Sequence, residues 1–269
     1  MTDIAALAGD FLAETRRLAG EVRRSPHAPD TPTLFKGWST DAILRHLHTW
    51  NEAARLSLTD EAAFTALLAG AAPAIGAGGL RAYEDAALGH LSGEALVRAW
   101  LAEAERTADA FAGADPDARL PWVGPPMSAA SSLTARLMES WAHGQAVFDA
   151  NGVERADTDA IRPIAELGVR TFGWTYAVRG EPRPATKPHV RLTTPSGAIW
   201  AWNDHSDTER IEGPATAFCQ VVTQTRNVAD TALTVTGAVA RDWMGKAQCF
   251  AGGPETPPSP GLRRRADAA

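Results

Sequence analysis

Residues 128–150 read SAASSLTARLMESWAHGQAVFDA, and this stretch decides the fold of the N-terminal part of the chain. Its apolar residues recur at the three- and four-residue spacing of an amphipathic helix. Ser128 can cap the free N–H groups at the start, and Asn151-Gly152 closes the end. The preceding segment, Pro121–Pro126, contains three prolines and cannot be helical. The pattern therefore predicts a long helix that follows a proline-rich loop.

Several helices are predicted before this one. The first covers residues 3–24, and the second begins at Trp38-Ser39-Thr40-Asp41 and runs to about Ser57. A short helix rich in Ala and Leu starts at Thr59, and another covers about residues 92–112. A proline-rich connector at 25–37 and a glycine-rich break at 76–79 separate these segments. Four long helices with such connectors predict a four-helix bundle.

The hydrophobic period changes to strand-like alternation from about residue 186. Residues 189–194 and 198–202 flank the turn Pro195-Ser196-Gly197 and predict a hairpin. Further segments predict a strand at 208–212, a helix at 214–225, a strand at 232–236 and a helix at 240–250. The fold class is therefore α+β, with a helical bundle followed by a small α+β domain. A helix at 158–180 either completes the bundle or links the two domains, and the tail after Gly252 is expected to be disordered.

The composition is that of a folded enzyme or binding protein, and it excludes several classes. With 269 residues, 45% hydrophobic and 22% charged, the chain has no run near the ~20 apolar residues that span a bilayer. The net charge of −6 and scattered basic residues argue against nucleic acid, since only Arg263–Arg265 cluster, in the expected tail. The start of the chain does not resemble a secretory signal, so the cytoplasm is expected. Cys219 and Cys249 are too few for a disulfide framework and are expected in apolar helices of the core.

Glu139 and His143 form the most informative pair in the sequence. Four residues apart on the long helix, they share one face and lie on or beside its apolar stripe. A helix offers a carboxylate and an imidazole to one metal ion in this way, and a metal would compensate the cost of burying both. The same spacing also suits a surface pair that stabilises the helix slightly. The sequence leaves both interpretations open at this point.

A third ligand would have to come from another helix, and His46 is the best candidate. It lies within the apolar stripe of the second helix, whereas His48 falls on the polar side beside Glu52 and Arg55. We therefore interpret His48 and Glu52 as a solvated salt bridge of little energetic value. The alternative for His46 is a core histidine that bonds to a backbone carbonyl.

Two strings carry a resemblance to a known family. Residues 37–47, GWSTDAILRHL, and residues 136–145, RLMESWAHGQ, resemble the DinB-like metal-binding bundle of mycothiol-dependent maleylpyruvate isomerases. The resemblance is closest to an uncharacterised actinobacterial branch that shares the loop GPPMSAAS at 124–131. Weaker matching strings, IEGP at 211–214 and LTVTG at 233–237, extend it into the C-terminal domain.

The resemblance implies a domain plan and a set of site residues. It implies a bundle at 1–180, a small α+β domain at 181–252 and a tail at 253–269. It also implies His46, Glu139 and His143 as ligands of a divalent metal, Zn²⁺ first and Fe²⁺ or Ni²⁺ as alternatives, with mycothiol as a co-substrate. The family commonly has an acid three residues after the second histidine, where this chain has Ala146, and Asp149 comes three later. Arg226 is the nearest counterpart of the arginine that the isomerases use from the C-terminal domain, as a contact for a substrate anion or a thiolate.

Three functions are compatible with these residues. Three protein ligands leave one position open on a tetrahedral metal, which is typical of a catalytic site. We expect an isomerase or S-transferase in which the metal holds a small thiol as the thiolate that attacks an electrophilic small molecule. The alternatives are a metal-dependent hydrolase or lyase without a thiol, and a metal-stabilised binding protein whose tryptophans line a ligand site. The expected partners are small molecules, without nucleic acid or membrane, and the protein is expected as a monomer or homodimer.

Overall fold

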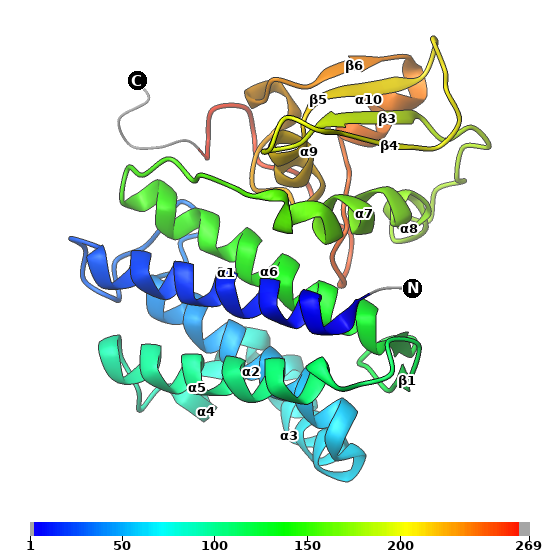
Figure 1. Cartoon of the computed structure of the whole chain (residues 1–269). Helices are drawn as coiled ribbons and strands as arrows, with labels where there is room; N and C mark the ends of the chain where they lie inside the picture. Colours follow the sequence, from blue (N-terminus) through cyan, green and yellow to red (C-terminus); the bar gives the residue numbers. More distant parts are fainter. Residues whose placement is uncertain (1–2, 264–269) are drawn as a thin grey trace. The chain divides into compact units, whose positions relative to one another are not determined.

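The computed structural model describes residues 3–263 and divides into two compact units, one ending at Asn151 and the other starting at Gly152 (Figure 1). The family resemblance implied a boundary at residue 180 instead. The difference concerns the segment 158–180, whose apolar face packs on α9 of the second unit. The core of either unit could have buried this apolar face, and the hydrophobic pattern alone did not distinguish the two possibilities.

Four long helices form the core of the first unit. They are α1 (Ile4–Arg24), α2 (Thr40–Thr59), α5 (Gly93–Ala112) and α6 (Ala129–Ala150). Each of α1 and α2 packs against both α5 and α6, which is the arrangement of the predicted four-helix bundle. Leu18, Ile43, Leu47 and Trp100 are fully buried where the helices meet. The side chains of Ser39 and Ser128 cap α2 and α6, as their sequences predict.

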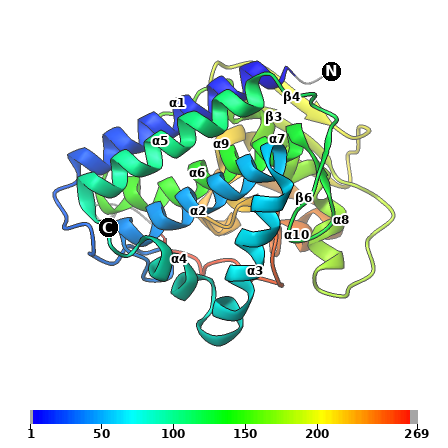
Figure 2. The same cartoon turned by 90° about the horizontal axis from the view of Figure 1, so that it is seen from below.

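Two additional helices connect α2 to α5. They are α3 (Glu61–Gly78) and α4 (Leu80–Leu88), and both pack against α2 (Figure 2). The predicted glycine-rich break shrinks to Gly79, which has a φ of 82°, because α3 continues through Gly76. The helix α4 was not predicted, and it matters because it carries one buried glutamate toward α2. Two short strands, β1 (Arg119–Leu120) and β2 (Met127–Ser128), pair across the predicted proline-rich loop.

The second unit contains a mixed four-stranded sheet in the order β4-β3-β5-β6. Its strands are β3 (His189–Thr193), β4 (Ile199–Trp202), β5 (Arg210–Pro214) and β6 (Thr234–Thr236). β3 is antiparallel to β4 and parallel to β5, and β6 is antiparallel to β5. Val190 and Leu192 are buried on β3 while their neighbours are not, and α9 packs against β3 and β5. The expected α+β fold is therefore confirmed.

The helices of the second unit are shorter than the sequence predicts. They are η1 (Asp159–Ile161), α7 (Arg162–Arg170), α8 (Phe172–Ala177), α9 (Ala215–Val222), η2 (Val228–Asp230) and α10 (Ala238–Met244). The helix predicted at 158–180 is interrupted at Thr171, whose hydroxyl bonds back to the carbonyls of Leu167 and Gly168. Gly168 is where α7 approaches α9, since a Cβ there would lie 2.8 Å from Val222. This close approach of the two helices explains why position 168 is a glycine.

The predicted disorder of the tail is wrong for the residues up to Arg263. Asn227 donates a hydrogen bond to the carbonyl of Pro258, which is buried, and the Arg263 guanidinium donates to the carbonyl of Gln224. Hydrogen bonds to neighbouring folded residues fix the position of this segment, and the amino-acid composition does not reveal such bonds. Arg264 and Arg265 lie outside the described residues.

Both cysteines are buried, as expected. Cys219 lies in α9, but Cys249 follows the end of α10 rather than lying within a helix. A search of the described residues for a helix long and apolar enough to cross a membrane finds none.

Candidate metal centre

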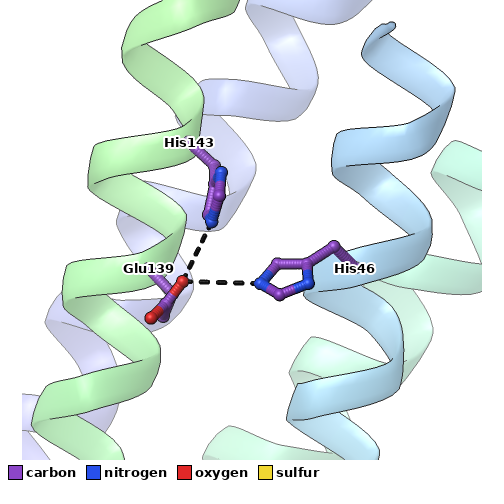
Figure 3. Close-up of side chains that lie close together, drawn as sticks. All are labelled: His46, Glu139 and His143. Atoms are coloured by element: carbon purple, nitrogen blue, oxygen red, sulfur yellow. Dashed lines mark ion pairs between the residues drawn. The ribbon is translucent and has the colours of Figure 1, made fainter. Parts of the chain in front are cut away.

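His46, Glu139 and His143 converge between α2 and α6 (Figure 3). The Nε2 atoms of His46 and His143 lie 3.5 Å and 3.0 Å from Glu139 Oε2. All three ligand atoms lie within 4.8 Å of one another. The i, i+4 spacing on α6 and the inward position on α2 therefore produce the cluster that the periodicity predicted.

The spacing of these atoms fits a metal ion. Zinc–ligand bonds of about 2.1 Å in a tetrahedron place neighbouring ligand atoms about 3.4 Å apart. The measured separations of 3.5 Å and 3.0 Å are close to that edge. Two imidazoles and one carboxylate are a donor set that binds Zn²⁺, and also Fe²⁺. The residues present therefore fit a divalent ion with one coordination position left open.

A second carboxylate fixes the orientation of His46. Glu84, on α4, is 1% exposed, and its Oε1 accepts a 2.8 Å hydrogen bond from His46 Nδ1. The same oxygen accepts a 3.1 Å bond from Trp50 Nε1. With Nδ1–H given to Glu84, the remaining ring nitrogen of His46 faces Glu139. A carboxylate behind a histidine ligand fixes its tautomer and raises its basicity.

Aromatic rings, rather than a second carboxylate, fix the orientation of the His143 ring. Trp38 stacks on its imidazole at 5.5 Å with an interplanar angle of 10°, and Phe35 meets it edge-on at 4.8 Å. In the part of the chain that the structure describes, the buried Nδ1 of His143 has no hydrogen-bond partner. Its ring position therefore depends on packing, whereas that of His46 depends on a hydrogen bond.

Burial and mutual contacts shift the pKa values of the three clustered side chains. Burial acts to lower the pKa of His46, but hydrogen bonds to Glu139 and Glu84 outweigh it and raise that pKa to about 9. Burial acts to raise the pKa of Glu139, but its two histidine partners hold it well below the ordinary value. Burial lowers the pKa of His143 and the nearby His46 adds to this effect. The His46 proton is therefore the one positive charge that faces the Glu139 carboxylate in this cluster, and a bound metal ion would take its place.

The other residues singled out in the sequence have different outcomes. Within the described chain no ion pair joins His48 to Glu52, and the neighbouring Arg55 pairs with Glu103 at 2.7 Å. His48 is half-buried, and burial lowers its pKa, so the interpretation as a solvated salt bridge was wrong. Asp149, the acid shifted by three residues, is buried and accepts a 2.9 Å bond from Gln145.

Arg226 belongs to the second unit, where it follows α9 and its Nη1 donates to the carbonyl of Thr225. All the residues of the metal site belong to the first unit. Its role at the site therefore stays a prediction.

Sequence reasoning missed Glu84. It lies on a nine-residue helix with no metal-ligand spacing to the histidines. The signal that could have revealed it is the faint amphipathic pattern of residues 80–88, in which Glu84 falls on the face that packs against α2.

Comparison with known proteins agrees with the fold. Residues 11–148 match the family model described as the mycothiol maleylpyruvate isomerase N-terminal domain. Two proteins of Mycobacterium tuberculosis, from strains CDC 1551 / Oshkosh and H37Rv and both described as uncharacterized, are each 38% identical over 257 residues. The alignment covers 94% of this chain and 98% of each relative.

Two solved structures share the fold at low sequence identity. One is the crystal structure of the mycothiol-dependent maleylpyruvate isomerase, with a TM-score of 0.51 and 15% identity. The other is a histidine-to-alanine mutant of that enzyme, with a TM-score of 0.53 and 15% identity. Each comparison covers 82% of this chain and 91% of the other chain. The match over residues 11–148, just over half of the chain, shows that the chain belongs to the family of the mycothiol maleylpyruvate isomerase N-terminal domain.

Proposed function

We propose that this protein is a metal-dependent enzyme of the thiol-dependent isomerase or S-transferase type. His46, Glu139 and His143 would hold a divalent ion, with zinc as the first candidate. The observation that carries the proposal is the convergence of two imidazole nitrogens on one carboxylate oxygen at 3.5 Å and 3.0 Å. A three-ligand set of this kind keeps an open position for a reactant, whereas structural zinc is usually held by four ligands.

A bound divalent ion would supply one kind of chemistry, which is to stabilise the thiolate of an incoming thiol. The side chains around it then have separate tasks. Glu84 keeps His46 in the tautomer that presents Nε2 to the site. Trp38 and Phe35 fix the ring of His143 and keep water from its faces. The thiolate would add to an electron-poor double bond or displace a leaving group, and an isomerase would expel the thiol again after rotation about the saturated bond.

The relatives support this choice of chemistry over the alternatives. A solved structure with the same fold is described as a mycothiol-dependent maleylpyruvate isomerase, so a thiol and an electrophilic small molecule are the first reactants to test here. Arg226, if it reaches the site, would contact a substrate anion or the thiolate.

The test is a turnover assay with the purified full chain and maleylpyruvate, with and without mycothiol. We expect turnover that requires the thiol and that stops both in His143→Ala and after removal of the metal by a chelator. His48→Ala, which changes a histidine on α2 outside the cluster, is the matched control and should keep full activity. Turnover at the same rate without any thiol would contradict the proposal and favour a hydrolase or lyase.

A further inference from the structure

Arg136 is a buried cation beside the candidate metal centre, and its guanidinium forms no hydrogen-bonded ion pair with any described residue. Its side chain lies on α6 with 6% of the residue exposed, and its Nε is buried without a hydrogen bond. Across residues 3–263 its guanidinium forms no ion pair or hydrogen bond. It packs over the ring of Trp122 at 5.4 Å, and the charge of Glu139 attracts it. Burying an unpaired charge is costly, so this position needs a reason.

The other arginine that is buried in the described part of the chain has an anionic partner. Arg155, which is 8% exposed, forms a 2.9 Å ion pair with Asp157. Arg55 and Arg106 both pair with Glu103. The contrast indicates that Arg136 is not simply a structural ion pair of the bundle.

A chain of contacts connects Arg136 to the metal centre. It precedes Glu139 by three residues and His143 by seven, so the three side chains lie on the same side of α6. Trp122, under the guanidinium, meets Trp50 at 5.9 Å, and Trp50 donates to the Glu84 oxygen that holds His46. The guanidinium and the histidines therefore border the same group of aromatic rings.

We propose that Arg136 binds a carboxylate group of the small molecule on which the metal centre acts. This inference rests on the proposed function insofar as it assumes that a ligand enters the same site. The planar guanidinium fork pairs with a carboxylate through two parallel hydrogen bonds, and the adjacent rings suit a flat, conjugated ligand. A divalent ion and Arg136 together carry three positive charges against the two of Glu84 and Glu139, so the loaded site favours an anion.

The experiment measures binding of crotonate, a small conjugated carboxylate, and of its uncharged amide, crotonamide. It uses the full chain with the metal that it carries after purification, measured in every sample, and follows tryptophan fluorescence and thermal unfolding. The wild type should bind crotonate at least about tenfold more tightly than crotonamide. Arg136→Met should remove this preference. Crotonate should raise the unfolding temperature of the wild type and leave that of Arg136→Met unchanged.

Arg81→Met is the matched control, because it removes an equal charge from an exposed guanidinium that lies over Trp38 at 5.5 Å. We expect its affinity for crotonate to change by less than about twofold, since exposed charges are screened by salt. An equal loss in both variants would overturn the proposal, because it would show a general effect of charge.

A purely structural role for Arg136 makes different predictions. It would leave the crotonate preference intact in Arg136→Met and would lower the unfolding temperature of the ligand-free variant. On our account the ligand-free variant is as stable as the wild type or more stable, since an unpaired buried charge has been removed. If Arg136→Met does not fold, the polar Arg136→Gln carries the same comparison. Equal affinity of the wild type for acid and amide would overturn the proposal without any variant.

The outcome is independent of the turnover assay. Crotonate binding that depends on Arg136 would stand even if no thiol-dependent reaction were found. Thiol-dependent turnover with an unchanged crotonate preference in Arg136→Met would refute the anion site and keep the proposed function.

Discussion

Two glutamates are buried against the same helix, α2, and they serve different purposes. Glu103, on α5, is fully buried and lies between Arg55 and Arg106, and its Oε1 also faces the Thr107 hydroxyl at 3.4 Å. Glu84, on α4, is as deeply buried, but its partners are an imidazole and an indole N–H.

The difference lies in what balances each negative charge. Two guanidinium groups surround the Glu103 carboxylate, so we interpret this cluster as a structural contact that contributes to stability. His46 changes its charge with pH and is neutral as a metal ligand, so Glu84 orients His46 and responds to what His46 binds. Glu103, which pairs with arginines, is therefore expected to stabilise the bundle. Glu84, which bonds to a histidine, points to the candidate metal centre.

Glu103→Gln should have the largest effect and should act on stability alone. The substitution leaves two arginines without their anion, and breaking a buried ion pair costs roughly 3 kcal/mol of unfolding free energy. Urea denaturation measures this loss, and elemental analysis should show an unchanged metal content. Loss of metal in a folded Glu103→Gln would remove the distinction between the two glutamates.

Glu84→Gln should act on the metal affinity rather than on the stability of the fold. The amide can still accept the bond from His46 but lacks the charge, and changes behind a ligand lower metal affinity by about 10- to 100-fold. Competition with a chromophoric chelator measures this affinity. Asp85→Asn is the matched control, since Asp85 is exposed and pairs with Arg45. Equal metal affinity in wild type and Glu84→Gln would mean that Glu84 is a structural residue like Glu103.

The metal-free protein should become less stable as the pH rises. The pKa of His46 is raised from 6.5 to about 9 by its two carboxylates. Between pH 6.5 and 9 the folded state therefore holds a proton that the unfolded state lacks. The resulting stabilisation of the folded state is fully present below pH 6.5 and is lost as the pH rises through 9. After chelator treatment we expect a loss on the order of 2 kcal/mol between pH 7 and 9.

Two controls sharpen this pH test. His46→Gln and the metal-loaded wild type should both lack the decline, because neither carries the His46 proton. A decline of the same size in His46→Gln would assign the effect to another group.

The sequence predicts the ligands of the site better than their surroundings. His46, Glu139 and His143 follow from helical periodicity, because each lies on a long helix whose inward face is marked by apolar residues. Glu84 is harder to predict, because α4 has nine residues with a faint amphipathic pattern and its place beside α2 depends on the reversal at Gly79. Arg136 looks like an ordinary polar helix residue until its burial and missing partners are seen.

The same limit explains the errors in the fold. The bundle helices and the hairpin of β3 and β4 follow from their periods and turn residues. The segment 158–180 has an apolar face that either core could bury, and only tertiary contact assigns it to the second unit. The order of residues 252–263 depends on side-chain hydrogen bonds to distant carbonyls, such as that of Arg263, which leave no local pattern.

The most direct test of the account is the metal content of the purified full chain. Wild type and His48→Ala would be compared with His46→Ala, Glu139→Ala and His143→Ala, with circular dichroism to confirm that each is folded. The account predicts about one divalent ion per chain in the first two proteins and almost none in the three folded ligand variants. A wild type that binds no zinc, iron or nickel even after incubation with each, or ligand variants that keep the ion, would contradict it.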